Sequence, residues 1–158
     1  MIEYTPGCIS TTEYSIEDIE MKYKKMRKTV TRCNDIFTFD IEVTSAFIKP
    51  NGVVIPYKPG YDNDYWNELD KLALPYIWQF SVNERVYYGR EFRDFLKVLD
   101  ELPKVELIIW VHNLSYEFMF LQNLVTFTDV FARAPHKPMK AKCKEYPHIT
   151  FRCSYVLT

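Results

Sequence analysis

The sequence predicts an α/β domain built on a mixed β-sheet that is flanked by helices. The chain has 158 residues, of which 47% are hydrophobic and 16% aromatic. Strand-like segments dominate its first half, and helical and strand-like segments alternate in its second half. A chain of this length and apolar content can bury one sizeable core, which excludes global disorder. Early strands followed by alternating helices and strands are typical of a mixed sheet covered by helices.

The first half is predicted to contain one helix and then a meander of strands. Residues 15–28 carry apolar side chains at helical spacing, so we expect a helix there. Residues 36–44 alternate between apolar and polar side chains, which is the pattern of a half-buried strand. A short strand is expected over residues 53–57, and a longer one over residues 76–82. A tight turn joins the latter to a hairpin partner at Arg85–Gly89.

The second half is predicted to alternate between helices and buried strands. Residues 91–101 have a helical apolar stripe, and residues 105–112 are almost continuously apolar, as in a strand buried on both faces. Asn113 is placed to cap the next helix. A basic loop is expected over residues 134–147 and a last strand over residues 149–157. The order strand, strand, strand, helix, strand, helix, strand is that of the ribonuclease H-like fold without its final helix.

Charge is balanced over the whole chain but uneven along it. The 20 Lys and Arg residues and the 21 Asp and Glu residues give a formal net charge of -1. This balance argues against a protein that coats nucleic acid by bulk positive charge. Residues 21–32 and 133–152 are nevertheless strongly basic, which suits a polyanionic partner at one face; the alternative is ordinary solvated surface. We expect a cytoplasmic location without membrane contact, because no apolar run reaches membrane-spanning length and the first residues lack a signal-peptide pattern.

Two acids on the strand at residues 36–44 are the first candidates for chemistry. Asp40 and Glu42 are two residues apart. A strand places such residues on one face, roughly 6.6 Å apart. Two aligned carboxylates need a counter-charge inside a fold, and a divalent metal ion commonly provides it. The alternative is a plain solvated strand face.

A second candidate cluster follows the buried strand at residues 105–112. Asn113 ends that strand and Glu117 lies one helical turn later, so both can face a cleft at the C-terminal end of the strand. Ligands tend to collect at this end in sheets of this type. Taken alone, Asn113 could be a simple helix cap and Glu117 a first-turn acid favoured by the helix dipole. The combination of both acidic motifs favours a functional interpretation.

The two motifs resemble the first two exonuclease motifs of family B DNA polymerases. The string Phe-Asp40-Ile-Glu42-Val-Thr is similar to the first motif, D-x-E, and His112-Asn113-Leu-Ser-Tyr-Glu117-Phe is similar to the second, N-x3-D. The pattern His-Asn-Leu-x-aromatic-acid is most similar to the protein-primed DNA polymerases of bacteriophages and related elements. The chain differs from the family in having Glu rather than Asp at the acidic position of the second motif.

The resemblance covers about residues 36–158, which we expect to form an exonuclease-like domain that is incomplete at its C-terminus. The last predicted strand resembles the one that precedes the third exonuclease motif, Y-x3-D. Tyr155 is followed by Val-Leu-Thr, so the Tyr and Asp of that motif have no counterpart. Residues 1–35 carry no part of the resemblance and are expected to form an N-terminal extension with one helix.

The resemblance implies a 3′–5′ proofreading exonuclease that uses two Mg²⁺ or Mn²⁺ ions to hydrolyse phosphodiester bonds at single-stranded DNA 3′ ends. Asp40 would bridge both metals, Glu42 would hold the ion that activates the attacking water, and Glu117 would contact the other ion. These three residues are therefore the implied catalytic and metal-binding groups. The missing third-motif acid implies weak activity or none for the isolated chain.

The implied substrate contacts lie on the second motif and on the basic segment. Asn113 would orient the single-stranded 3′ end, and His112 and Tyr116 would support it by stacking or packing. Lys140 and Lys142 are expected to contact the DNA backbone. The implied partners are single-stranded DNA and the rest of the polymerase or a terminal protein, for a viral protein in its host cell.

Two other classes of function remain open from the sequence. One is a non-catalytic module of the same fold that binds DNA or a protein. The other is a different two-metal nuclease of ribonuclease H-like fold, which a preference for RNA over DNA would indicate. Oligonucleotide binding, metal binding and cleavage together separate these classes.

Overall fold

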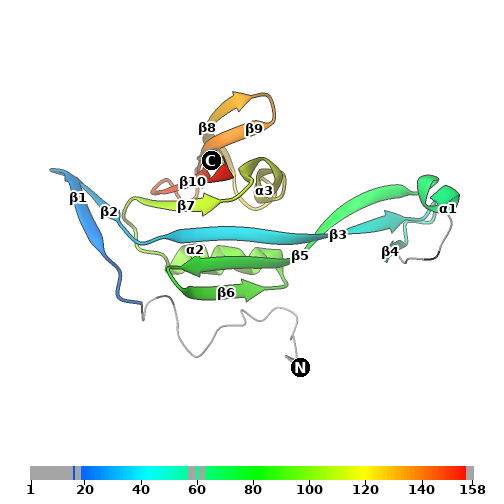
Figure 1. The fold of residues 1–158 in the computed structure, drawn as a ribbon, viewed down its shortest axis with the longest axis horizontal. Helices are drawn as coiled ribbons and strands as arrows, with labels where there is room; N and C mark the ends of the chain where they lie inside the picture. Colours follow the sequence, from blue (N-terminus) through cyan, green and yellow to red (C-terminus); the bar gives the residue numbers. More distant parts are fainter. Residues whose placement is uncertain (1–15, 17–18, 57–59, 61–62, 156–158) are drawn as a thin grey trace.

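An eight-stranded mixed sheet forms the centre of the computed structural model, which describes residues 16, 19–56, 60 and 63–155 (Figure 1). The strands are β1 (Tyr23–Arg27), β2 (Val30–Cys33), β3 (Phe37–Ile48), β4 (Val54–Pro56), β5 (Asp70–Val82), β6 (Arg85–Gly89), β7 (Leu107–Val111), β8 (Phe127–Ala134), β9 (Lys137–Cys143) and β10 (Ile149–Cys153). The helices are α1 (Asn63–Asn67), the 3-10 turn η2 (Phe92–Asp94), α2 (Phe95–Glu101) and α3 (Leu114–Leu121). The predicted α/β class is confirmed.

The sheet runs in the order β6-β5-β3-β7-β10-β9-β8, and β4 pairs with the far half of β3. The strands β3, β5 and β6 form an antiparallel meander, whereas β3, β7 and β10 are parallel to one another. The hairpin of β8 and β9 extends the sheet on the other side of β10 in antiparallel pairing. The carboxyl ends of β3, β7 and β10 therefore point in the same direction.

The alternation of residues in β3 places one side of this strand in the core. Phe37, Phe39 and Ile41 are buried, and the polar residues between them are exposed. On the buried side, Phe95 of α2 stacks on Phe39 with ring centroids 4.2 Å apart. Figure 1 shows α2 alongside β3 and β5, the strands that it covers. The core thus fixes which face of β3 carries the polar side chains.

Most predicted elements are confirmed, with shifts at their ends. The strand predicted over residues 36–44 is β3, and the hairpin of β5 and β6 turns through Asn83, which has a positive φ of 53°. Helix α2, strand β7, helix α3 and strand β10 also lie where the sequence predicted them. Both β3 and β5 are longer than predicted and extend as an arm, which β4 and α1 complete (Figure 1). None of the helices in the described part of the chain is long and apolar enough to cross a membrane.

The predicted helix over residues 15–28 is wrong where the structure describes it, because Tyr23–Arg27 is strand β1. Strand β1 pairs antiparallel with β2, and the backbone N–H of Cys33 donates to the carbonyl of Glu106 at 2.8 Å, which ties this hairpin to β7. Tyr23 and Met26 belonged to the supposed apolar stripe, but both are exposed. Ser15 lies outside the described residues. Tertiary pairing therefore overrides the helical spacing.

The predicted basic loop over residues 134–147 is also wrong, because its central half, Lys137–Cys143, is strand β9. Two strands flank β9, β8 on one side and β10 on the other. The prolines in this segment suggested a loop, yet Pro138 lies near the start of β9, next to the hairpin turn in which His136 has a φ of 59°. The alternation of Lys140 and Lys142 with small residues was the strand signal that the lysines obscured.

Candidate active site

The candidate site lies where β3 passes the carboxyl end of β7. In the parallel pairing of these strands, Phe39 is opposite Val111. Asp40 is therefore level with His112, the residue that leads from β7 toward α3. This register brings the first acidic motif next to the segment that carries the second one. It is a tertiary arrangement that the spacing of either motif could not reveal.

Glu117 and Asp40 form a close pair of carboxyl groups. Glu117 is only 4% exposed, and its Oε2 has no hydrogen-bond partner among the described residues. The pKa of Glu117 is raised from 4.5 to about 7, mainly by burial, with smaller contributions from the adjacent charge of Asp40 and a hydrogen bond to it. Two like charges in a partly dry site disfavour full ionisation. A bound cation would relieve both the repulsion and the unsatisfied oxygen.

Glu42 lies on the same face of β3 as Asp40 and is exposed. A β-bulge in the pairing with β5 falls directly after it, between Glu42 and Val43. The prediction that Asp40 and Glu42 share one polar strand face is confirmed. Glu42 is two residues further along β3 than Asp40, toward the arm.

The Asp40–Glu117 pair has the chemistry of a site for a hard divalent cation. No three His, Cys, Asp or Glu side chains in the described ranges form a group that could hold a metal ion by themselves. Mg²⁺ is nevertheless usually bound by one or two carboxylates together with water and substrate phosphates. Oxygen ligands, a buried unpaired oxygen and like-charge repulsion all fit such an ion, so these residues suit Mg²⁺ or Mn²⁺.

Asn113 does not act as the side-chain cap of α3. Its backbone carbonyl accepts hydrogen bonds from the N–H groups of Tyr116 and Glu117, at 2.8 and 3.4 Å, but its side chain makes no cap hydrogen bond. The side chain is exposed and lines a cavity. The Asn113 side chain therefore does not serve as a helix cap, and its amide group is available to bind a ligand.

That cavity has a volume of about 750 Å³ and lies between the start of α3 and the hairpin of β8 and β9. Arg133, His136 and Lys137 come to its wall from the hairpin, and Tyr155 comes from the segment after β10. None of the described residues that line it is acidic. The sequence places Arg133 and Lys137 in a basic segment, but it predicts a loop where the hairpin forms, so their position beside Asn113 was not expected. The cavity can accept an anionic ligand next to Asn113.

The aromatic residues of the second motif lie at the same edge of the sheet. His112 is exposed and meets Tyr155 edge-to-face, with ring centroids 5.6 Å apart. Tyr116 is 41% exposed and meets Phe120 edge-to-face at 5.4 Å. Each has an open ring surface beside the cavity or the helix start. Both are therefore available for stacking against a ligand.

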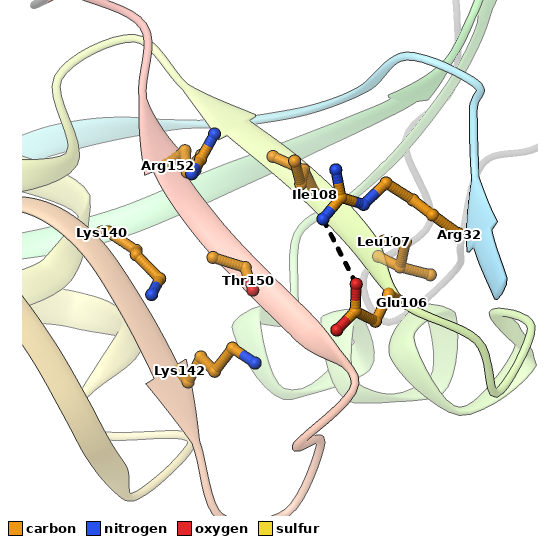
Figure 2. Close-up of a pocket in the computed structure, with 8 residues that line it drawn as sticks. All are labelled: Arg32, Glu106, Leu107, Ile108, Lys140, Lys142, Thr150 and Arg152. Atoms are coloured by element: carbon orange, nitrogen blue, oxygen red, sulfur yellow. Dashed lines mark hydrogen bonds and ion pairs between the residues drawn. The ribbon is translucent and has the colours of Figure 1, made fainter. Parts of the chain in front are cut away.

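Lys140 and Lys142 are not beside the Asp40–Glu117 pair. They lie on β9, three strands away from β3, and line a separate pocket (Figure 2). Lys140 approaches Asp129 at 3.7 Å, which is a long and largely exposed ion pair. The structure thus divides the predicted site residues into an acidic site and a distant basic pocket.

Comparison with known proteins adds no assignment. No family model, curated protein or solved structure matches this chain. The functional argument therefore depends on the geometry of the site. Its central feature is a pair of carboxyl groups from two distant segments, beside a basic cavity that Asn113 lines.

Proposed function

We propose that this chain is a metal-dependent 3′–5′ exonuclease domain that acts on single-stranded DNA, similar to the proofreading domain of protein-primed family B DNA polymerases. The observation that carries the proposal is the pairing of Asp40 with Glu117. The two acids belong to the D-x-E and N-x3-acid motifs, which are far apart in sequence, and the fold brings them together. Without a bound cation, two adjacent carboxyl groups with a buried oxygen that lacks a hydrogen bond would destabilise the folded protein.

The sheet supports the same proposal. The order β6-β5-β3-β7-β10, with an antiparallel meander followed by two parallel strands, agrees with a ribonuclease H-like sheet. The hairpin of β8 and β9 is then an insertion between α3 and the last strand. In this sheet type, ligands collect at the carboxyl ends of the parallel strands. The carboxyl pair and the 750 Å³ cavity both lie at that end.

Each residue has a distinct task in the proposed reaction. Asp40 and Glu117 hold the divalent ions, and Glu42 contributes from the exposed side of the strand. When bound, these ions supply an activated water and stabilise the leaving oxygen of an in-line phosphoryl displacement. Asn113 orients the terminal nucleotide through its free amide. Arg133 and Lys137 attract the phosphates that enter the cavity.

Metal binding and cleavage test this proposal directly. Wild-type protein is titrated with Mn²⁺ by calorimetry and incubated with 5′-labelled single-stranded DNA, with or without EDTA. We expect saturable Mn²⁺ binding and stepwise shortening of the labelled strand that EDTA stops. The Asp40→Ala/Glu42→Ala variant should lose the binding heat and at least about 100-fold of the cleavage rate, because the ions would no longer be positioned.

A matched control removes two acids elsewhere. Asp64 lies in α1 and Glu68 directly after it, and both are exposed. Because α1 is at the far end of the arm (Figure 1), Asp64→Ala/Glu68→Ala should bind Mn²⁺ and cleave DNA as the wild type does. Single-strand binding without any Mn²⁺ binding would contradict the proposal and support a non-catalytic DNA-binding module. Faster cleavage of RNA than of DNA would contradict the DNA specificity and support another two-metal nuclease.

A further inference from the structure

A second pocket, with a volume of about 180 Å³, lies where β2, β7, β9 and β10 meet (Figure 2). Its polar lining consists of Arg32, Glu106, Lys140, Lys142, Thr150 and Arg152. Four cations from three strands thus surround one carboxylate. A hollow of this size is suited to a small anionic group.

Strand register explains why these side chains share one face. Arg152 is opposite Trp110 on β7 and opposite Lys140 on β9, and Thr150 is opposite Lys142. Directly paired residues in a sheet project to the same side, so Arg152 lies beside Lys140, and Lys142 lies on the same face two residues further along β9. Arg32 joins them from β2, which lies beside Glu106.

The positive charge of this pocket is only partly compensated. Arg32 is bonded to Glu106 at 3.2 Å, and its Nε is buried without a hydrogen-bond partner among the described residues. Within the described ranges, no acidic side chain lies within ion-pair distance of Lys142 or Arg152. The guanidinium of Arg152 lies over the ring of Trp110, 6.0 Å from its centroid. Grouped cations with unused donors favour an anion with several oxygen acceptors.

The pocket and the acidic site share one face of the sheet. Thr38, Trp110, Arg152 and Lys140 form one row across four strands, and Asp40 is the next residue along β3 on that side. From strand spacing and rise, the Cα atoms of Asp40 and Arg152 are roughly 12 Å apart. This distance corresponds to about three or four nucleotides at the rise of a stacked strand.

We propose that this pocket binds a backbone phosphate of the single-stranded nucleic acid whose end is held at Asp40 and Glu117. The inference rests on the proposed exonuclease function for the identity of the ligand, and on the pocket for its position. The strand runs across the sheet face from the acidic site, and Lys142, Arg152 and Arg32 hold a phosphate several nucleotides from the reacting bond. The pocket increases affinity for longer strands and takes no part in bond cleavage.

Fluorescence anisotropy with a 5′-labelled DNA strand of about 10 nucleotides tests the pocket in EDTA, so that the result does not depend on metal. The Lys142→Gln/Arg152→Gln variant should bind at least about tenfold more weakly than wild type, and the salt dependence of its binding should fall by about 1 to 2 in log–log slope. Lys142→Arg/Arg152→Lys should retain most of the affinity because it keeps both charges.

The control removes the same charge from the arm. Lys49 directly follows β3, and Lys71 lies on β5 in the arm. Lys49→Gln/Lys71→Gln should bind within about twofold of wild type, because the arm extends away from β2, β9 and β10 (Figure 1) and salt screens charges that are far apart. Equal affinity of wild type and Lys142→Gln/Arg152→Gln, with both folded by circular dichroism, would overturn the proposal. Displacement of the DNA by polyglutamate at equal charge concentration would also overturn it, in favour of an acidic protein partner.

The pocket and the active site can fail separately. If Mn²⁺-dependent cleavage requires Asp40 while the pocket variant binds DNA normally, the exonuclease stands and the pocket assignment is overturned. If the pocket variant loses affinity while wild type binds no Mn²⁺, the pocket is supported and the exonuclease is contradicted. A labelled dinucleotide, too short to reach the pocket, should be cleaved equally by wild type and by Lys142→Gln/Arg152→Gln.

Discussion

Glu117→Gln is expected to make the metal-free protein more stable than wild type at about pH 8, by about 1–3 kcal/mol. The cause is the buried position of Glu117 beside Asp40, which raises its pKa from 4.5 to about 7. Between about pH 4.5 and about pH 7, the folded state therefore keeps a proton on Glu117 that the unfolded state has already lost. This stabilisation is complete below about pH 4.5 and is lost as the pH rises through about 7.

The same substitution should weaken metal binding. Gln cannot supply a charged oxygen, so we expect Mn²⁺ affinity to fall by at least about 100-fold. In wild type, Mn²⁺ binding at about pH 6 should release a proton, because Glu117 must ionise to bind the ion. A site that lowers the stability of the empty protein in order to bind a ligand is a common arrangement in enzymes.

Urea unfolding in EDTA at about pH 5 and about pH 8 measures the first effect. The stability difference between Glu117→Gln and wild type should increase with pH, whereas the exposed control Glu68→Gln should show no change at either pH. Unfolding with Mn²⁺ in place of EDTA should then show stabilisation of wild type but not of Glu117→Gln. A difference that stays constant between the two pH values would contradict the assigned pKa shift of Glu117.

Phe95→Ala is expected to destabilise the protein by about 3–5 kcal/mol. Phe95 has no exposed surface. Its ring packs against three other rings, with centroid distances of 4.2 Å to Phe39, 5.7 Å to Trp78 and 5.9 Å to Phe80. Truncation would leave a cavity between α2 and the strands β3 and β5. The loss would be a large share of the stability of a typical domain. Because Phe39 precedes Asp40, the same cavity would also loosen the support of the acidic site.

Phe131→Ala provides the matched control for this second prediction. Phe131 lies on β8 and is 61% exposed, so its truncation should change stability by no more than about 0.5 kcal/mol. The free energies of unfolding are measured in urea for both variants under one condition. Similar values for the two substitutions would show that α2 does not pack on β3 and β5 as described.

The fold was predictable where a local pattern also agreed with the tertiary structure. Strand β3 shows this agreement, because its alternation is a property of the extended backbone and one face meets α2. The segment around Tyr23 shows the opposite case. Its apolar spacing fits a helix, but pairing with Cys33 and docking against Glu106 make it a strand. Local secondary-structure propensity predicts the conformation of a segment poorly when the segment can form long-range hydrogen bonds.

The basic residues show the same limit for function. The sequence identified Lys140 and Lys142 as candidates for nucleic-acid binding but could not place them relative to Asp40. The pairing of β9 with β10 puts them beside Arg152 in a pocket of their own. The position of Arg133, His136 and Lys137 beside Asn113 was not predicted, because it depends on the hairpin of β8 and β9.

Local patterns in the sequence were sufficient to predict the α/β class, the polar face that Asp40 and Glu42 share, and the position of Glu117 in the first turn of its helix. These features depend on residues a few positions apart, and backbone geometry fixes how such residues are oriented. The contact of Glu117 with Asp40 and the grouping of four cations in a separate pocket depend on the tertiary structure. Those contacts join segments distant in sequence, and their geometry is set by parallel strand register and core packing, which no short pattern encodes.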